Sequence, residues 1–253
     1  MVSISFLKVA LASLIVVSFA MFQGSTAVAA ATYTLFGDAQ LVHPGHNSDT
    51  AVQLRSVMTA PQAATHGGID FDTPPMTVRD LDNLQTDYMF TAGSCGGGAP
   101  RFQINVGTPV GTKNIFVYIG PPPNYVGCPA NVWRSTDDLL TPISFVDTSQ
   151  LPGGRFYDTW GEAQARYAGF AVSGIQLVTD GGWAVTGGTQ TVQVDNVKIN
   201  ATTYTFEAEV SPGDKQKCKN GGWRNFTTAP GPFKNQGDCV SYFATGGRNK
   251  GNG

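Results

Sequence analysis

TQTVQVDNVKINATTYTFE, residues Thr189 to Glu207, is the stretch that decides the fold. Apolar and polar residues alternate along its first half, with a one-residue slip at Asp195-Asn196, and this pattern predicts a β-strand that carries a bulge. A turn at Asn200-Ala201 leads into a second β-rich run, Thr203 to Phe206. We therefore expect the two halves to pair as a hairpin that closes a sheet at the end of a domain.

Short alternating runs of the same kind fill the chain before this stretch. Gly, Pro, Asn and Asp separate them, and long segments with helical periodicity are nearly absent. Short strands with turn-rich connections are typical of antiparallel sandwiches, so the sequence predicts an all-β, jelly-roll-like antiparallel β-sandwich. The predicted strands are Tyr33 to Phe36, Ala39 to Val42, Ala51 to Ser56, Gly68 to Phe71, Tyr88 to Thr91, Arg101 to Val106, Asn114 to Ile119, Ser144 to Val146, Ala171 to Thr179 and Trp183 to Val185.

One segment, Thr159 to Tyr167, predicts a short helix instead. Its first residues match the capping-box pattern, with Thr159 followed three residues later by Glu162. Trp160, Ala163 and Tyr167 then recur at helical spacing. Because large aromatic side chains are usually buried, Trp160 is expected to pack over one end of the sandwich.

Residues 1–30 are predicted to be a secretory signal peptide. Lys8 supplies a positive charge, residues 9–22 are apolar apart from two serines, and Ala27-Val28-Ala29 offers the small residues that a signal peptidase reads. The alternative is a retained membrane anchor, but the apolar run is shorter than the roughly 20 residues that span a bilayer. We expect a secreted protein, extracellular or at the cell surface, with no membrane span after cleavage.

Charge divides the mature chain into a sandwich domain, 31–207, and a C-terminal region. Residues 31–207 carry 8 Lys and Arg against 15 Asp and Glu, whereas residues 208–253 carry 7 against 3. An acidic body does not fit nucleic-acid binding, which needs positive charge over a folded face. Composition divides the C-terminal region into a linker (208–216), a small basic module (217–245) and a disordered tail (246–253). The basic module is the part that could contact an anionic cell-wall polymer.

The four cysteines form two groups along the chain. Cys95 and Cys128 lie in the body, and Cys218 and Cys239 lie in the basic module. Three pairings are possible, and the change of composition between the groups favours the local pairs. Disulfides are the default in an oxidising compartment. Zinc is the alternative, although neither pair has the close spacing of a structural zinc site.

Several segments of the chain resemble known families. They are GDAQLVHPGHNSDTAVQLRS, GGIDFDTP, TDYMFTAGSCGGGAPRFQI, VYIGPPPNYVGCP, VDNVKIN, and CKNGGWRNF with FKNQGDCVSY. The first five resemble a family of uncharacterised secreted bacterial proteins, over nearly all of the mature chain, and this resemblance implies no known activity. The last pair is similar to a short C-terminal module of exported bacterial proteins. The strand VDNVKIN is distantly similar to jelly-roll carbohydrate-binding modules and laminin-G-like domains, which implies ligand binding on a sandwich.

The sequence does not predict a catalytic site. The body has two glutamates, Glu162 and Glu207, and lacks the E-x-D-x-x-E strand of sandwich glycosidases. Asp70 and Asp72 point the same way along one strand, as the two carboxylates of a hydrolase would. A solvated strand end before the prolines that follow is the favoured interpretation of this pair.

The three histidines are expected to be free on the surface. His43-Pro44-Gly45-His46 contains turn-forming residues, which would not aim two rings at one metal, and His66 stands alone. No serine sits in a G-x-S-x-G elbow, so a Ser-His-Asp set is not supported either.

The resemblance to jelly-roll modules implies a structural calcium ion near the first and last strands. Calcium prefers carboxylate and carbonyl oxygens. The candidate ligands are Asp38, Asp195 and Glu207. The alternative is that Asp195 merely belongs to the bulge.

Glycan binding would need an aromatic ring and a few fixed polar groups, and one loop offers both. Residues 120–125, GPPPNY, are restricted by three prolines and tied to Cys95 through Cys128. The candidate ligand-binding residues are Tyr125, Asn124, Trp133 and Asp137. The alternative is a rigid surface loop without a ligand.

Three functions fit these observations. The first is a secreted, non-catalytic β-sandwich that binds glycan or cell-envelope material, such as a polysaccharide. The second is an extracellular structural or protein-interaction domain without a sugar site. The third is a jelly-roll glycoside hydrolase or lyase, which the small number of carboxylates disfavours.

Overall fold

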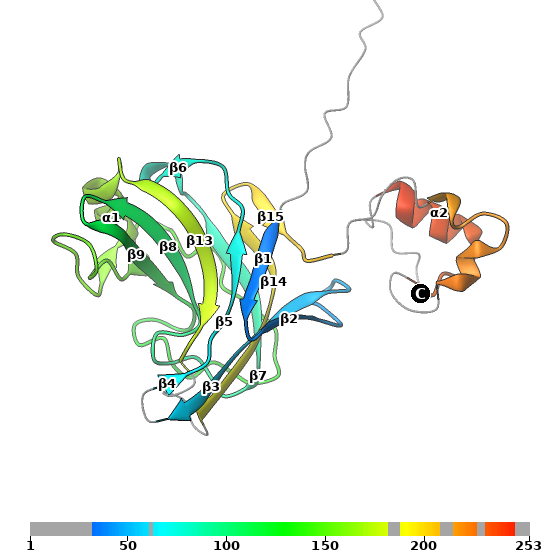
Figure 1. The fold of residues 1–253 in the computed structure, drawn as a ribbon, viewed down its shortest axis with the longest axis horizontal. Helices are drawn as coiled ribbons and strands as arrows, with labels where there is room; N and C mark the ends of the chain where they lie inside the picture. Colours follow the sequence, from blue (N-terminus) through cyan, green and yellow to red (C-terminus); the bar gives the residue numbers. More distant parts are fainter. Residues whose placement is uncertain (1–31, 61–62, 182–187, 208–214, 227–230, 246–253) are drawn as a thin grey trace, which may run out of the picture.

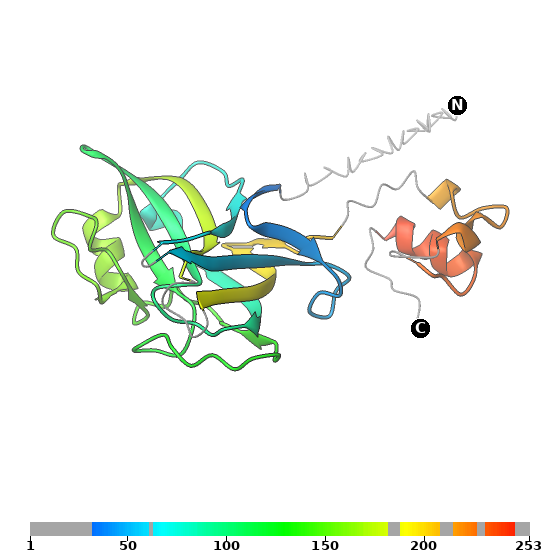
Figure 2. The same cartoon turned by 60° about the horizontal axis from the view of Figure 1, so that its bottom comes forward.

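The computed structural model describes residues 32–60, 63–181, 188–207, 215–226 and 231–245. Within them the chain forms two antiparallel β-sheets that pack face to face, which confirms the predicted sandwich (Figures 1 and 2). The predicted signal peptide, the predicted strand Trp183 to Val185 and the disordered tail lie outside the described residues.

The first sheet has the strand order β1-β5-β13-β8-β9, and β6 pairs with β13. Its side chains alternate between the core and the outer face. In β8, Phe102 and Ile104 are fully buried, whereas Arg101 and Gln103 between them are part-exposed. The strands are β1 (Tyr33–Gly37), β5 (Gly67–Phe71), β6 (Met76–Thr77), β8 (Arg101–Thr108), β9 (Gly111–Tyr118) and β13 (Ala171–Thr179).

The second sheet has the order β10-β7-β14-β3-β2, with β15 paired to β14 and β4 paired to β3. In β3, Val52 and Leu54 are buried as the alternation predicts, and Gln53 and Arg55 lie on the opposite side. The strands are β2 (Ala39–Val42), β3 (Ala51–Ala60), β4 (Ala63–Ala64), β7 (Leu84–Ala92), β10 (Arg134–Ser135), β14 (Thr189–Ile199) and β15 (Thr202–Tyr204).

Strand β14, the first half of the stretch that decides the fold, lies in the middle of the second sheet. It pairs with β7 along one side and with β3 along the other. The register to β7 shifts between Asp195 and Lys198, which confirms the predicted bulge, and Asn196 there has a φ of 48°. The predicted hairpin with β15 forms. The expectation that this pair closes a sheet needs correction, because the long strand is central and organises the sheet from within.

The predicted helix is confirmed as α1 (Trp160–Tyr167). The backbone N–H of Glu162 donates to Thr159 Oγ1, and the N–H of Thr159 donates to the Glu162 carboxylate over 2.9 Å, which completes the capping box. Trp160 and Tyr167 are fully buried. The helix packs beside a short hairpin of β11 (Phe145–Val146) and β12 (Asp158–Thr159) and beside the 3-10 turn η1 (Val78–Asp80).

The C-terminal module has a small core of its own. Cys218 and Cys239 form a disulfide, and the rings of Phe233, Tyr242 and Phe243 pack around it. Its elements are the 3-10 turn η5 (Gly222–Asn225) and the helix α2 (Gln236–Ala244). Helix α2 was not predicted from the sequence. Asn235 begins it by accepting a 2.9 Å hydrogen bond from the N–H of Asp238.

The second predicted disulfide, Cys95 with Cys128, also forms, with both sulfurs buried in the body.

Within the described residues, none of the helices has the length and apolar character that crossing a bilayer requires.

Candidate functional site

The outer face of the first sheet carries a row of polar side chains. The strand register places Thr34, Asp70, Gln176, Gln103 and Phe116 next to one another across β1, β5, β13, β8 and β9. Because side chains two residues apart share a face, all of them point away from the core. The Gln103 amide donates a 3.2 Å hydrogen bond to the Gln176 carbonyl oxygen. The middle of the row is therefore a fixed pair of amides on an exposed face.

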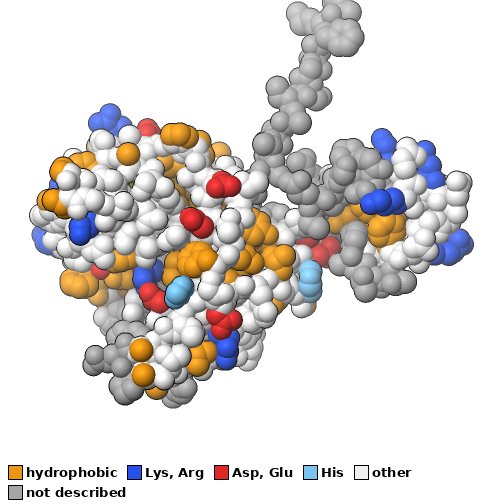
Figure 3. Space-filling model, viewed as in Figure 1, with side chains coloured by type: hydrophobic (Ala, Val, Ile, Leu, Met, Phe, Trp, Pro, Cys, Tyr) orange, Lys and Arg blue, Asp and Glu red, His pale blue; other side chains and the backbone are white. Residues whose placement is uncertain are grey.

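A second row lies beside the first. It runs through Phe36, Gly68, Val178, Arg101 and Tyr118 on the same five strands. Figure 3 shows apolar, acidic, basic and histidine side chains close together over the part of the molecule where β1, β5 and β13 run in Figure 1. The two rows together are called the outer face below.

Arg101 and Asp180 form an ion pair on the outer face. Both terminal nitrogens of Arg101 donate to the Asp180 carboxylate, each over 2.7 Å. The guanidinium also lies over the ring of Phe116, 4.7 Å from its centroid. The Arg101 side chain is 12% exposed and that of Asp180 40% exposed. A bidentate pair stacked on a ring has little freedom, so the polar atoms of Asp180 are held in one position.

An open pocket of about 510 Å³ lies on the outer face. Phe36, Ala64 and Val178 form its apolar part. The polar part is made by Gln103, Gln176, Asp180 and His66. The pocket is thus a shallow, mainly polar site with a small apolar wall, open to solvent.

Aromatic rings extend the outer face at its β9 edge. The rings of Phe116 and Tyr118 are nearly parallel, with centroids 6.5 Å apart, and Tyr125 follows 5.5 Å from Tyr118. The Tyr118 hydroxyl donates to Asp147 over 2.6 Å. Burial, together with this hydrogen bond, raises the pKa of Tyr118, so the hydroxyl remains a donor at neutral pH.

Two of the predicted ligand-binding residues, Tyr125 and Asn124, lie at this edge. Tyr125 is half-buried against Tyr118, and burial raises the pKa of its hydroxyl. Asn124 is exposed beside it. The loop that the Cys95–Cys128 disulfide ties down therefore brings an aromatic ring to the first sheet.

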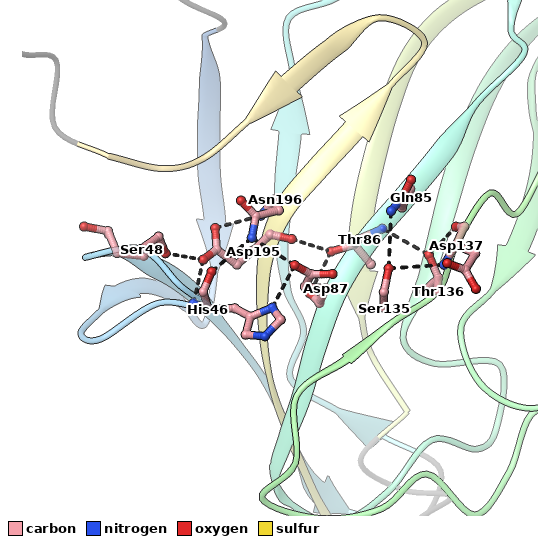
Figure 4. Close-up of polar contacts among 11 residues, drawn as sticks. His46, Ser48, Gln85, Thr86, Asp87, Ser135, Thr136, Asp137, Asp195 and Asn196 are labelled. Carbon is pink, nitrogen blue, oxygen red and sulfur yellow. Dashed lines mark hydrogen bonds and ion pairs between the residues drawn. The ribbon is translucent and has the colours of Figure 1, made fainter. Parts of the chain in front are cut away.

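The other two predicted residues, Trp133 and Asp137, lie next to β10 on the second sheet. The Trp133 ring stacks on His46, with centroids 5.0 Å apart and planes 12° apart. The Asp137 N–H donates to Ser135 Oγ over 3.3 Å (Figure 4). The contacts of Trp133 and of Tyr125 belong to different sheets, so the structure does not bring the four predicted residues together.

A polar cluster surrounds His46 on the second sheet (Figure 4). His46 Nδ1 lies 2.8 Å from an oxygen of Asp87, and the Asn196 amide donates to the same oxygen over 2.9 Å. The backbone N–H of His46 donates to Asp195 over 2.8 Å, and Ser48 donates to the same carboxylate. The expectation of a free surface histidine is wrong for His46, because the segment around it folds over the sheet.

The three predicted calcium ligands each have other partners. Asp195 is fully buried and accepts from two backbone N–H groups and the Ser48 hydroxyl. Burial raises the pKa of this carboxyl. Glu207 accepts from the N–H groups of Asp49 and Thr50 over 2.8 and 3.1 Å.

Asp38, the third of these residues, pairs with Arg55 over 3.1 Å. In the described part of the chain, no three His, Cys, Asp or Glu side chains are grouped as a metal-ligand set. The arrangement as it stands does not fit a calcium ion shared by the three carboxylates. Calcium remains a prediction from the sequence.

Sequence reasoning missed most of the outer face. The alternation in Arg101 to Val106 already indicated that Gln103 points outward, but strand order and register are needed to place it beside Gln176. Asp180 follows the last residue of β13, where no local pattern marks a functional role.

Comparisons with known proteins identify no family. No protein-family model matches the chain, and no curated protein sequence matches it. The family 11 carbohydrate-binding module of the cellulosomal cellulase Lic26A-Cel5E of Clostridium thermocellum is similar in structure, with 13% identity, a TM-score of 0.37, and coverage of 70% of this chain and 89% of that chain. An exo-beta-agarase has 13% identity and a TM-score of 0.28, and the match covers 76% of this chain and 26% of the agarase. At these values the similarities assign no ligand to this chain.

Proposed function

We propose that this protein is a secreted, non-catalytic glycan-binding protein and that its outer face holds the ligand. The observation that carries the proposal is the amide pair Gln103–Gln176, flanked by the Arg101–Asp180 ion pair and by aromatic rings. Sugar hydroxyls need hydrogen-bond donors and acceptors in fixed positions, and the apolar side of a sugar ring packs on an aromatic ring. The outer face offers both.

The polar groups of the outer face are held before any ligand arrives. Arg101 is fixed by Asp180, by the Gly98 carbonyl oxygen over 3.0 Å and by the ring beneath it. Groups that are already ordered lose little conformational entropy on binding, which favours affinity. This preorganisation suits a binding role, although the same cross-strand contacts also stabilise the sheet.

A pair of matched variants tests the proposal. Gln103→Ala/Gln176→Ala removes the amides from the outer face, and Gln53→Ala/Gln193→Ala removes a cross-strand glutamine pair from the second sheet. In gels that contain soluble polysaccharides, we expect retardation of the wild type and of the control, and at least about tenfold weaker binding by the first variant. Equal loss in both variants, or loss in the control alone, would place the ligand elsewhere.

The two alternative functions have separate readouts. A wild type that is retarded by no polysaccharide would favour a structural or protein-interaction domain. Release of reducing sugars from a polysaccharide would favour a hydrolase or lyase.

The basic module supports a second proposed interaction, with an anionic cell-wall polymer. Lys217, Lys219, Arg224 and Lys234 are exposed around the small core of the module, and Figure 3 shows Lys and Arg side chains spread over its surface. Attraction between exposed charges is screened within about 10 Å at 0.1 M salt. Binding of the full protein to purified teichoic acid should therefore weaken steeply as salt rises. Retention that is independent of salt would contradict this interaction.

Calcium is proposed separately, as a stabilising ion near Asp195 and Glu207. In that case calcium binds the folded protein and not the unfolded chain, so it should raise the melting temperature. The effect should disappear in Glu207→Gln, which lacks the carboxylate ligand. An identical melting temperature in calcium and in a chelator would contradict the proposal and would leave the two carboxylates with their hydrogen-bonding role alone.

A further inference from the structure

The ring of Phe36 lies flat against the first sheet, and Gly68 makes this possible. A Cβ atom built on Gly68 would be 2.3 Å from Cζ of Phe36 and 2.8 Å from both Cε atoms. Both Cε atoms are equally close, and an atom placed beyond Cζ in the plane of the ring would be farther from them, so the Cζ end of the ring covers Gly68 with its face. No residue with a Cβ fits beneath the ring, since real Cβ atoms do not approach other atoms so closely.

A ring that lies flat on a sheet has its second face turned away from the sheet. Phe36 is part-exposed and lines the open pocket, together with the Gln103–Gln176 amides and Asp180. An apolar platform beside fixed hydrogen-bonding groups matches a pyranose ring, which is apolar on one side and carries hydroxyls around its edge.

Charge limits the kind of sugar. The positive charge of Arg101 is matched by Asp180, and the exposed carboxylate of Asp70 lies in the neighbouring row. Residues 31–207 as a whole carry more acidic than basic side chains. Among the described residues that line the pocket there is one aspartate and one histidine but no lysine or arginine, so a uronate or sulfate group finds no permanent positive charge there.

We propose that this pocket binds a neutral pyranose unit of a glycan, with Phe36 as the stacking platform and Gly68 as a positioning residue. The inference rests on the proposed function and specifies its ligand class and contact. Gly68 itself need not touch the sugar, because its role is to let the ring lie flat.

The experiment compares four variants by retardation in gels that contain neutral hydroxyethylcellulose or galactomannan, or anionic polygalacturonate. Phe36→Ala should weaken binding to a neutral polysaccharide about tenfold, and Phe36→Tyr should retain it because the aromatic face remains. Gly68→Ala should weaken binding because its Cβ displaces the ring. The double variant Phe36→Ala/Gly68→Ala should lose no more than Phe36→Ala alone, since both changes remove one platform.

Gly174→Ala is the matched control. Gly174 lies on the same face, and a Cβ there would be 3.2 Å from the amide nitrogen of Asn105, which is the end of a side chain that can shift by the few tenths of an ångström required. It should bind as the wild type does, and thermal unfolding should show that all variants are folded.

The outcomes separate the pocket from the proposed function. Unchanged binding in Phe36→Ala, with loss in Gln103→Ala/Gln176→Ala, would overturn the role of Phe36 as the stacking platform. The proposed glycan binding by the outer face would still hold. Tighter binding to polygalacturonate than to the neutral polymers would overturn the ligand class. A wild type that binds none of the polymers would overturn both the inference and the function on which it rests.

Discussion

The imidazole ring of His46 lies parallel to the indole ring of Trp133, with 5.0 Å between their centroids. Asp87 holds the same imidazole through Nδ1 over 2.8 Å. One side of Trp133 is therefore covered by a residue from the segment between β2 and β3. The Trp133 ring, which the sequence predicted as a ligand contact, thus joins the segment between β2 and β3 to the second sheet.

This relationship predicts a mainly structural effect of Trp133→Ala. Loss of the stacked pair should lower the free energy of unfolding by at least about 1 kcal/mol, because aromatic pairs contribute on this scale beyond the area that the indole buries. Glycan binding should remain, as measured by gel retardation beside Phe36→Ala. If Trp133→Ala abolishes binding while the protein stays folded, the ligand contacts Trp133, as the sequence alone predicted.

Gly45 should tolerate no larger side chain. A Cβ there would lie 2.0 Å from Ser48 Oγ, 2.5 Å from the Thr50 carbonyl oxygen and 2.6 Å from Asp195 Oδ2. Gly45→Ala must push the segment off Asp195 and leave a buried carboxylate with fewer donors, at a cost of about 1–3 kcal/mol. Urea unfolding measures the effect, with Gly107→Ala as control because the nearest atom to its added Cβ is 3.8 Å away. Equal stability of the two variants would show that this contact is not needed.

Asp158 should make stability depend on pH. It is fully buried, which by itself would raise its pKa, but hydrogen bonds from Thr148, Arg166 and Arg155 outweigh burial and lower the pKa below its ordinary value. A depressed carboxyl pKa contributes stability above the unfolded value of about 3.9, and this contribution is lost as pH falls through the folded value.

Asp158→Asn tests this assignment. At neutral pH the variant should melt roughly 5–10 °C lower than the wild type, because two arginines lose their charged partner. The difference should shrink below about pH 4. A difference that stays constant between neutral and acidic pH would mean that the carboxylate charge is not what stabilises the fold.

The disulfide of the basic module should decide whether that module folds. Its core consists of a few aromatic side chains around Cys218 and Cys239, and a loop of about 20 residues gains roughly 3 kcal/mol from such a closure. Cys218→Ala/Cys239→Ala should therefore unfold the module, seen as a change in the fluorescence of Trp223, whose ring packs against this core. The melting temperature of the sandwich should be unaffected. A module that stays folded without the bridge would show that the aromatic core suffices.

The sequence by itself determined the kind of fold, because the information is local. Two-residue periodicity, turn residues and a capping box act within a few neighbours, so most of the longer strands, the bulge at Asp195 and the helix from Trp160 could be predicted without coordinates. The two disulfides could also be predicted, since composition separates the pairs. The helix α2 was missed although Asn235 is a local N-cap signal, because in so short a region the helix also depends on the packing of Phe233, Tyr242 and Phe243 around the bridge.

Tertiary structure alone decided where the candidate site lies. Gln103 and Gln176 are 73 residues apart in sequence. Phe36 and Gly68 come from different strands, and the register between β1 and β5 places them side by side. Aromatic residues in loops were the local signal for a ligand. This signal selected Tyr125, which lies at the edge of the outer face, and Trp133, which stacks on His46. Hydrogen bonds between strands that are distant in sequence bring the side chains of one sheet face together. Which strands pair depends on how the whole core packs, so no local sequence pattern reveals it.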